Sequence, residues 1–339
     1  MSQTEPGRGV HVRVAVAVPC TDRKRGGEVP PGASLRSIGS DLPVAQRVTR
    51  WVDLLVQKRA EGGGLRLADL YVGPGWAAST ELVSEVSNRF DHSVEAFVIS
   101  AGLGLQRLDH QGQRWPRYSA TFNAAHPDSV VLERGDRGGT SRDWWEALGN
   151  DSRLGGGTFS ALASTHGGIL VVASAPYLRA ASSDLAEAAR CGLRVVAFAA
   201  SAPRLGELED YMVRLDPRAR SAVPASDARA SADFVAYAAR ELGEDLLDVA
   251  AARSFVERTL EGRTPPRRPR GVASRPEEVR SFIQDALRAD IRIRKGPLLR
   301  RWRDSGRAFE QKRFGAIYDE VASVIRGEQP DEHEGHRGR

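Results

Sequence analysis

Short apolar runs alternate with helix-like stretches along the first two thirds of this 339-residue chain. Apolar runs rich in valine and alanine are typical of strands buried on both faces of a sheet. Strands that alternate with helices predict an α/β fold, with a mostly parallel sheet flanked by helices. The predicted strands are 11–18, 65–71, 94–100, 168–174 and 193–199, with an edge strand at 211–215, and the predicted helices are 43–59, 76–90, 177–190 and 231–261, the last being one or two helices capped by Ser231.

A polar loop follows the first predicted strand directly. It offers a thiol, a hydroxyl, a carboxylate and three cations, from Cys20, Thr21, Asp22, Arg23, Lys24 and Arg25. Open α/β sheets bind ligands at the carboxyl ends of their strands. This mixture of groups suits a small polar ligand that carries or develops charge, and a solvated surface loop is the alternative.

A second polar segment follows the predicted strand at 94–100. Gly102 and Gly104 allow the backbone to approach a ligand closely or to adopt positive φ. Asp109 and His110 come next, and the segment continues to Asn123. We expect this segment and the loop around Asp22 to meet at the carboxyl edge of the sheet.

Four short motifs in the first part of the chain resemble those of a known family. The motifs are Pro19-Cys20-Thr21 with Lys24, Asp69-Leu70-Tyr71, Ile99-Ser100-Ala101 with Gly104-Leu105, and Pro116 with Tyr118. Together they resemble the group that contains the YaaA peroxide-stress proteins and the base-modifying domain of archaeosine synthase. That group is similar in fold to the uracil-DNA glycosylase superfamily. The resemblance covers residues 10–125 well and 165–200 loosely, and Lys24 stands one residue earlier than in the family pattern.

Some related bacterial proteins are phage-defence DNA glycosylases that remove bulky modified cytosines. The resemblance therefore implies a hydrolase that flips out a base, for example glucosylated hydroxymethylcytosine, and cleaves its N-glycosidic bond to leave an abasic site. Cleavage builds positive charge on the sugar and negative charge on the departing base. Asp22 and Asp109 are the catalytic carboxylate candidates, although capping or surface roles remain equally open, and Tyr118 is the candidate donor.

The flipped nucleotide also needs a pocket that holds it by stacking and by edge contacts. The candidate substrate-binding residues are Cys20, Thr21, Arg23, Lys24, Tyr71, Trp76, Ser100, Asn123 and Ser174. Trp144 and Trp145 either stack on a base or fill the core, and core packing is the more common role of paired aromatic residues.

The catalytic motifs of well-known uracil glycosylases are absent. The chain has neither a Gly-Gln-Asp-Pro nor a His-Pro-Ser-Pro segment. His126-Pro127-Asp128-Ser129 is superficially similar to the second motif but comes before the strand that should precede it. Ser174-Ala175-Pro176-Tyr177 is the better match in position.

Lysine usage bears on the type of chemistry. The chain has four lysines, Lys24, Lys58, Lys295 and Lys312, and a Schiff-base mechanism needs a desolvated amine in the pocket. Lys24 alone is well placed for this role, and we favour attack by water over amine chemistry. Cys20 as a nucleophile is a weaker alternative, because no His–Asp pairing is visible beside it, and a pocket-lining or structural thiol is favoured.

Positive charge is concentrated toward the carboxyl terminus. The formal net charge is +5, whereas residues 261–326 carry 17 Lys and Arg against 9 Asp and Glu. Such a segment attracts polyanions in a salt-dependent manner. The predicted organisation is an α/β glycosylase-like domain at 11–262, a Pro/Arg linker at 263–274, a basic helical DNA-binding module at 275–326, and disordered ends at 1–10 and 327–339.

The basic module reads as short helices separated by glycine-containing turns, which fits a helix-turn-helix-like unit. One helix opens at Pro276, a break at Lys295-Gly296-Pro297 precedes a second, and a third covers 308–325. The candidate phosphate contacts are Arg300, Arg301, Arg303, Arg307, Lys312 and Arg313.

Composition excludes several other classes. Two cysteines provide neither a disulfide framework nor zinc-ligand spacing, so we expect a reducing cytoplasm and no metal or other cofactor. No apolar run approaches the roughly 18 residues that a membrane span needs.

DNA, and phage DNA in particular, is the expected partner, with no membrane and no obligate protein partner. A DNA-binding protein without catalysis and a tRNA base-modifying enzyme remain the alternatives.

Overall fold

The computed structural model describes residues 13–26, 29–30, 32–39, 42–110, 112–124, 126–131, 139–200, 204–266 and 271–327. The chain divides into two compact units, Met1–Pro266 and Arg267–Arg339. Of the terminal segments expected to be disordered, residues 1–10 and 328–339 lie outside the described residues, whereas Gly327 belongs to the last helix; residues 267–270 of the expected linker also lie outside them.

The first unit is built on a six-stranded sheet with the order β3-β2-β1-β4-β5-β6. All neighbouring strands are parallel except β3, which pairs antiparallel with β2. The central strand β1 has five consecutive fully buried residues, because a parallel strand in the middle of a covered sheet is apolar on both faces. The strands are β1 Arg13–Pro19, β2 Ser93–Ser100, β3 Gly104–Arg107, β4 His166–Val172, β5 Arg194–Ala200 and β6 Met212–Leu215.

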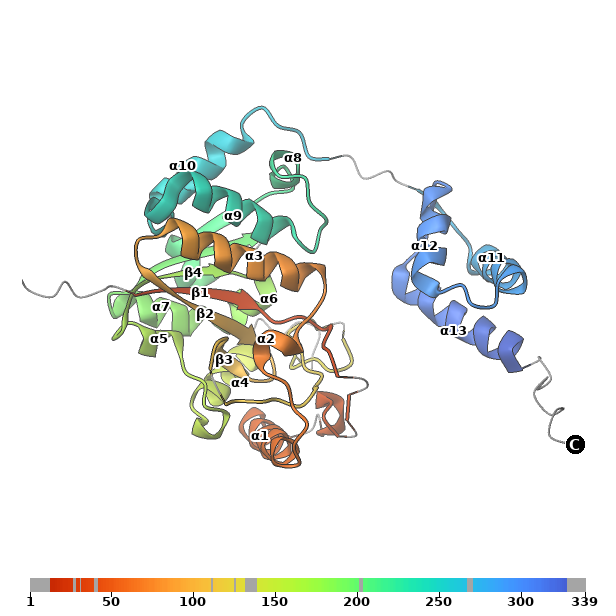
Figure 1. The fold of residues 1–339 in the computed structure, drawn as a ribbon, viewed down its shortest axis with the longest axis horizontal. Helices are drawn as coiled ribbons and strands as arrows, with labels where there is room; N and C mark the ends of the chain where they lie inside the picture. The colour runs from red at the N-terminus through yellow and green to blue at the C-terminus, as the bar shows by residue number, and fades with distance from the viewer. Residues whose placement is uncertain are drawn as a thin grey trace, which may run out of the picture. The chain divides into compact units, whose positions relative to one another are not determined.

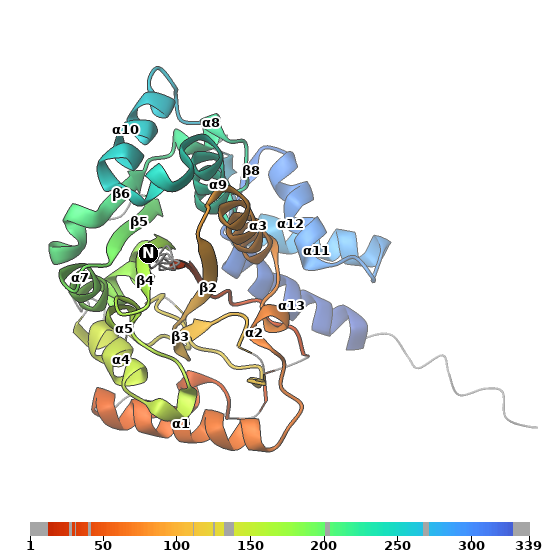
Figure 2. The same ribbon diagram turned by 60° about the vertical axis from the view of Figure 1, so that its left-hand side comes forward.

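Helices cover both faces of this sheet, as Figures 1 and 2 show. Helices α3 (Pro74–Arg89) and α9 (Ala230–Leu242) lie side by side on one face. Helices α4 (Gly139–Gly149), α6 (Ala175–Ala180) and α7 (Ser182–Arg190) pack on the other, and α1 (Val44–Ala60) packs on α4. The α/β fold with a mostly parallel sheet flanked by helices is therefore confirmed.

Shorter elements complete the first unit. The α-helical ones are α2 Leu67–Leu70, α5 Phe159–Leu162, α8 Ala219–Ala222 and α10 Val249–Leu260. The 3-10 turns are η1 Leu35–Ser37, η2 Ser152–Leu154, η3 Gly206–Tyr211 and η4 Gly243–Leu247.

Two local predictions are wrong. Residues 65–71 do not form a strand but the short helix α2, since the buried residues Leu67 and Leu70 are three apart and share a helical face. Only isolated bridges, at Leu65 and at Tyr71, remain of the expected pairing. Ser231 does not cap α9 either, because the helix begins one residue earlier and Arg229 holds the cap position.

The described residues of the second unit form three helices, α11 (Pro276–Ala289), α12 (Lys295–Asp304) and α13 (Gln311–Gly327), and a short ladder of β7 (Val272–Ala273) with β8 (Arg307–Ala308). It has its own apolar core, centred on Ile283, Leu298, Trp302 and Phe314. The expected break at 295–297 is instead the first turn of α12, where a proline is tolerated because its missing N–H has no helical partner.

Candidate functional site

A pocket of about 550 Å³ opens at the carboxyl ends of the parallel strands. It is lined by residues that end or follow β1, β4 and β5, among them Thr21, Ser174 and Ala200. The chain leaves β1 toward β2 on one side of the sheet, whereas β4 and β5 lie on the other side of β1. Open α/β sheets bind ligands at such a change of direction.

Two helices begin at this pocket. Gly73-Pro74-Gly75 at the start of α3, and Ala228, Ser231 and Ala232 at the start of α9, form part of its wall. Gly73 caps α3 with φ of +108°, a left-handed conformation that side chains other than glycine rarely adopt. The amino termini of helices carry partial positive charge, so this wall favours an anionic group of the ligand.

Charged side chains of both signs line the same pocket. Asp22 and Arg23 come from the loop after β1, and Asp227 comes from the segment before α9. Asp227 forms an ion pair with Arg220. Asp22 is exposed and, among the described residues, forms neither an ion pair nor a side-chain hydrogen bond. Its carboxylate is therefore available to a ligand.

The loop that presents Asp22 is held by hydrogen bonds to its own backbone and to that of Val72. The Thr21 hydroxyl donates to the carbonyl of Arg23 at 2.9 Å and lies 3.2 Å from that of Val72. The N–H of Val72 donates to the Arg23 carbonyl at 3.0 Å. These contacts tie the loop to the segment that leads into α3, so the two sides of the pocket are connected.

Four predicted site residues lie behind this wall rather than in the pocket. The hydroxyls of Tyr71, Tyr118 and Ser100 form a buried chain with O–O distances of 2.6 Å. The Lys24 ammonium donates to the carbonyl of Thr21 at 3.1 Å and lies 4.5 Å from the centre of the Tyr118 ring. Burial lowers the pKa of Lys24 and raises that of Tyr118, because both charged forms lose their hydration.

Gly102 makes room for the Tyr118 ring of this buried chain and does not line the pocket. A Cβ at Gly102 would stand 2.5 Å from a ring carbon of Tyr118, so the glycine lets the tyrosine pack against the backbone. Gly104 has φ of +72°, as its expected role in a turn requires. Cys20 and Trp76 are buried as well, and the Cys20 thiol lies 3.3 Å from the Tyr177 hydroxyl.

The expected position of Asp109 is wrong. Because β3 runs antiparallel to β2, residues after β3 approach the amino end of β2, away from the pocket. Asp109 is exposed and paired with Arg107 at 2.5 Å, and the hydrogen bond with that guanidinium holds the pKa of the carboxyl below its usual value. The pocket lining does not include Asp109, His110 or Asn123.

The paired tryptophans are core residues. Trp144 and Trp145 are fully buried in α4, and the Trp144 indole N–H donates to the Ala101 carbonyl at 2.7 Å. Trp145 stacks on Phe159 and donates to Asp184. Neither ring can stack on a base in this conformation.

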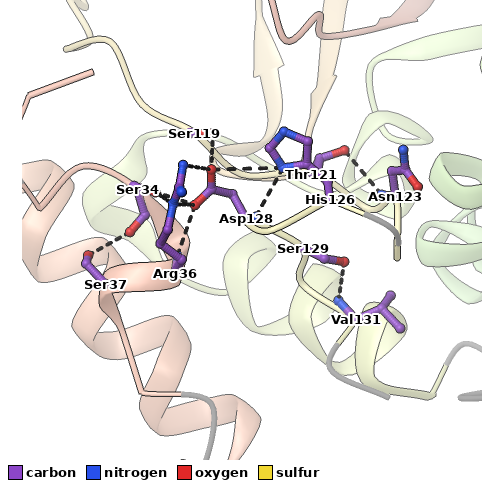
Figure 3. A network of polar contacts seen from close by, with 10 residues as sticks. All are labelled: Ser34, Arg36, Ser37, Ser119, Thr121, Asn123, His126, Asp128, Ser129 and Val131. Carbon is purple, nitrogen blue, oxygen red and sulfur yellow. Dashed lines mark hydrogen bonds and ion pairs between the residues drawn. The ribbon is translucent and has the colours of Figure 1, made fainter. Parts of the chain in front are cut away.

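The structure also shows a polar network around Asp128 that the sequence analysis missed (Figure 3). The Asp128 side chain is 1 % exposed and accepts hydrogen bonds from the hydroxyls of Ser34 and Ser119 and from the backbone and guanidinium of Arg36. Burial acts to raise the pKa of this carboxyl, but the hydrogen bonds together outweigh it and lower the pKa. The network fastens the segment after Tyr118 to residues 34–36.

Four of the predicted site residues, Thr21, Asp22, Arg23 and Ser174, line the pocket. Asp227, Ala228 and the start of α9 were not predicted as site residues, because that segment lies about 200 residues after β1 and carries no motif. The one available signal was the run of small residues that precedes α9.

In the second unit, α12 presents the expected basic residues. Leu298, Leu299 and Trp302 are buried, whereas Arg300, Arg301 and Arg303 are exposed. Arg307 lies over the Trp302 ring and Arg313 over the Phe309 ring, at 4.7 and 5.5 Å from the ring centres. The side chain of Lys312 lies outside the described residues.

In comparisons with known proteins, no protein-family model, no curated protein and no solved structure matches the chain. Within the described ranges, no group of three or more His, Cys, Asp or Glu side chains could hold a metal ion. No helix of the described part of the chain is long and apolar enough to cross a membrane.

Proposed function

We propose that this protein is a DNA glycosylase of the uracil-DNA-glycosylase-like type, which hydrolyses the N-glycosidic bond of a modified base. The observation that carries the proposal is the exposed Asp22 carboxylate in the pocket where the sheet changes direction. The motifs of the loop after β1 resemble the same family. Defence against phage DNA with modified cytosines is the context that this resemblance implies.

The pocket suits the charge changes of this reaction. The scissile bond breaks with positive charge on the sugar, which the Asp22 carboxylate stabilises while it orients the attacking water. Arg23 and the starts of α3 and α9 supply positive charge for a flanking phosphate or for the departing base. The volume of about 550 Å³ lies within the usual range for pockets that hold small molecules.

The proposed mechanism uses water and not an amine. Lys24 is 6 % exposed, donates to a backbone carbonyl and does not line the pocket, so its amine is not presented to the sugar. Tyr118 is enclosed in the hydroxyl chain with Tyr71 and Ser100, which favours a positioning role over direct proton donation.

The proposal is tested with purified full-length protein on plain DNA and on phage DNA that carries glucosylated hydroxymethylcytosine. After treatment with alkali or an abasic endonuclease, strand breaks and released base are measured. We expect breaks on the modified DNA alone. The absence of breaks on both, despite salt-sensitive binding, would contradict the glycosylase assignment.

That negative result would support a DNA-binding protein without catalysis. One observation favours this second candidate: several residues that the family resemblance assigns to the site, including Cys20, Tyr71 and Tyr118, are buried in the core of the first unit. The exposed arginines of α12 would then carry the function.

A further inference from the structure

A second, smaller pocket of the first unit is rich in arginine. It has a volume of about 260 Å³. Three of the residues that line it are Arg142 of α4, Arg179 of α6 and Arg204, which follows β5. They come from three separate parts of the sequence, so only the fold brings their charges together.

These arginines are only partly neutralised by the carboxylates around them, since Glu209, which interacts electrostatically with Arg204, is itself ion-paired with Arg214. Among the described residues, none of the three forms an ion pair. The acidic residue in the lining, Glu207, lies 3.8 Å from Arg190, which also pairs with Glu187. The pocket therefore has an excess of positive charge.

The remaining lining adds one neutral hydroxyl donor, that of Ser183, because the Ser182 hydroxyl hydrogen is used within the fold. Ser182 and Ser183 are the first two residues of α7, at the positive end of the helix dipole. The Ser182 hydroxyl donates to the Arg179 carbonyl at 2.9 Å, which fixes the end of α6 beside the pocket. Guanidinium groups and hydroxyls are the donors that proteins use to bind phosphate oxygens.

The arginine pocket lies close to the candidate active site along two elements. Ser174 lines the large pocket at the start of α6, and Arg179 lines the small one five residues later, about 7.5 Å along a helix. Arg204, in the smaller pocket, follows by four residues Ala200, which lines the large pocket at the end of β5.

We propose that Arg142, Arg179 and Arg204 form a phosphate-binding subsite that holds the backbone of the nucleic-acid strand whose base enters the large pocket. The proposal rests on the proposed function, since that function supplies the strand. It adds that the strand runs from the large pocket across the start of α7. A free phosphate or nucleotide offers the same chemistry, and the test separates the two sources.

The test compares two charge-matched double variants of the full chain. Arg179→Gln/Arg204→Gln removes two charges from the arginine pocket, and Arg50→Gln/Arg258→Gln removes two exposed charges on α1 and α10. Affinity for a fluorescein-labelled single-stranded 12-nucleotide DNA is measured by anisotropy from 50 to 200 mM salt. Binding of inorganic phosphate to each protein is measured by calorimetry.

We expect the pocket variant to bind DNA at least about fivefold more weakly than the control variant. The slope of log affinity against log salt should fall by about 0.7 for one lost contact with a single strand. Equal DNA binding by the two variants would overturn the proposal. Weaker phosphate binding with unchanged DNA binding would also overturn it, in favour of a free anion.

Failure of this proposal is distinct from failure of the proposed function. Base release by the wild-type protein tests the glycosylase assignment, whereas the binding comparison needs no catalysis. Base release together with equal binding by the two variants removes the subsite alone. Weaker DNA binding by the pocket variant without any base release leaves the phosphate subsite in a DNA-binding protein.

Discussion

Asp22 and Asp128 have the same side chain, but different burial and hydrogen bonding give the two carboxylates different roles. Both oxygens of Asp128 accept hydrogen bonds, and its side chain is almost completely buried. Asp22 is exposed at the pocket, where a ligand can reach it. The Asp128 carboxylate joins two segments of the chain by hydrogen bonds, and the Asp22 carboxylate is the candidate reactive group.

We expect Asp128→Asn to destabilise the protein by about 2 kcal/mol, because an amide cannot accept the full set of hydrogen bonds that the carboxylate receives. The melting temperature should fall by roughly 5 °C. Asp109→Asn is the control, since that exposed carboxylate has one ion-pair partner and its replacement should cost less than about 0.5 kcal/mol.

The effect of Asp128→Asn depends on pH. The folded protein holds the pKa of Asp128 below its ordinary value of 3.8, so the carboxylate stabilises the fold above that pH. This stabilisation is lost as the pH falls through the lower pKa of the folded state. The difference in melting temperature between wild type and variant should therefore shrink below about pH 4. A difference that grows on acidification would contradict this assignment.

Lys24 provides a test of the type of chemistry. We expect Lys24→Gln to keep base release within about tenfold of wild type, because the amine contacts a backbone carbonyl and the Tyr118 ring instead of the pocket. Sodium borohydride should trap no covalent complex between wild-type protein and DNA. A trapped complex that disappears in the variant would show that the lysine forms a Schiff base.

At the scale of single elements, continuous apolar runs predicted most of the strands. Buried parallel strands need apolar side chains on both faces. The run at 65–71 misled this reasoning. Its apolar residues satisfy a helical turn equally well, and burial of Leu67 and Leu70 selected the helix. The pairing of β3 could not be read from its own residues either, and its antiparallel direction moved Asp109 away from the pocket.

Helix α12 is the element that carries the expected contact with DNA phosphates. We expect Arg300→Gln/Arg303→Gln to weaken DNA binding about tenfold and to lower the salt slope by about 0.9 for each lost contact with duplex DNA. Arg275→Gln/Arg288→Gln, with two exposed arginines outside α12, is the charge-matched control. Equal losses in the two variants would show that only the net charge of this unit matters.

At the scale of the whole molecule, the chain forms two units with separate cores. The large unit contains the pocket, and the small unit has a core of its own and an arginine-rich helix. The pocket could be predicted only where the polar residues follow a strand directly, as Thr21, Asp22 and Arg23 do. Asp227 and the start of α9 join the large pocket, and the three arginines come together in the smaller one, only through tertiary packing. No local sequence pattern predicts such packing.

The most direct test of the proposal compares Asp22→Asn with Asp109→Asn in the base-release assay on modified DNA. Both changes replace one exposed carboxylate by an amide, but only Asp22 lines the pocket. We expect Asp22→Asn to lower base release by at least about 10²-fold with DNA binding retained, and Asp109→Asn to match wild type. Full activity of Asp22→Asn would contradict the central claim that this carboxylate acts on the sugar.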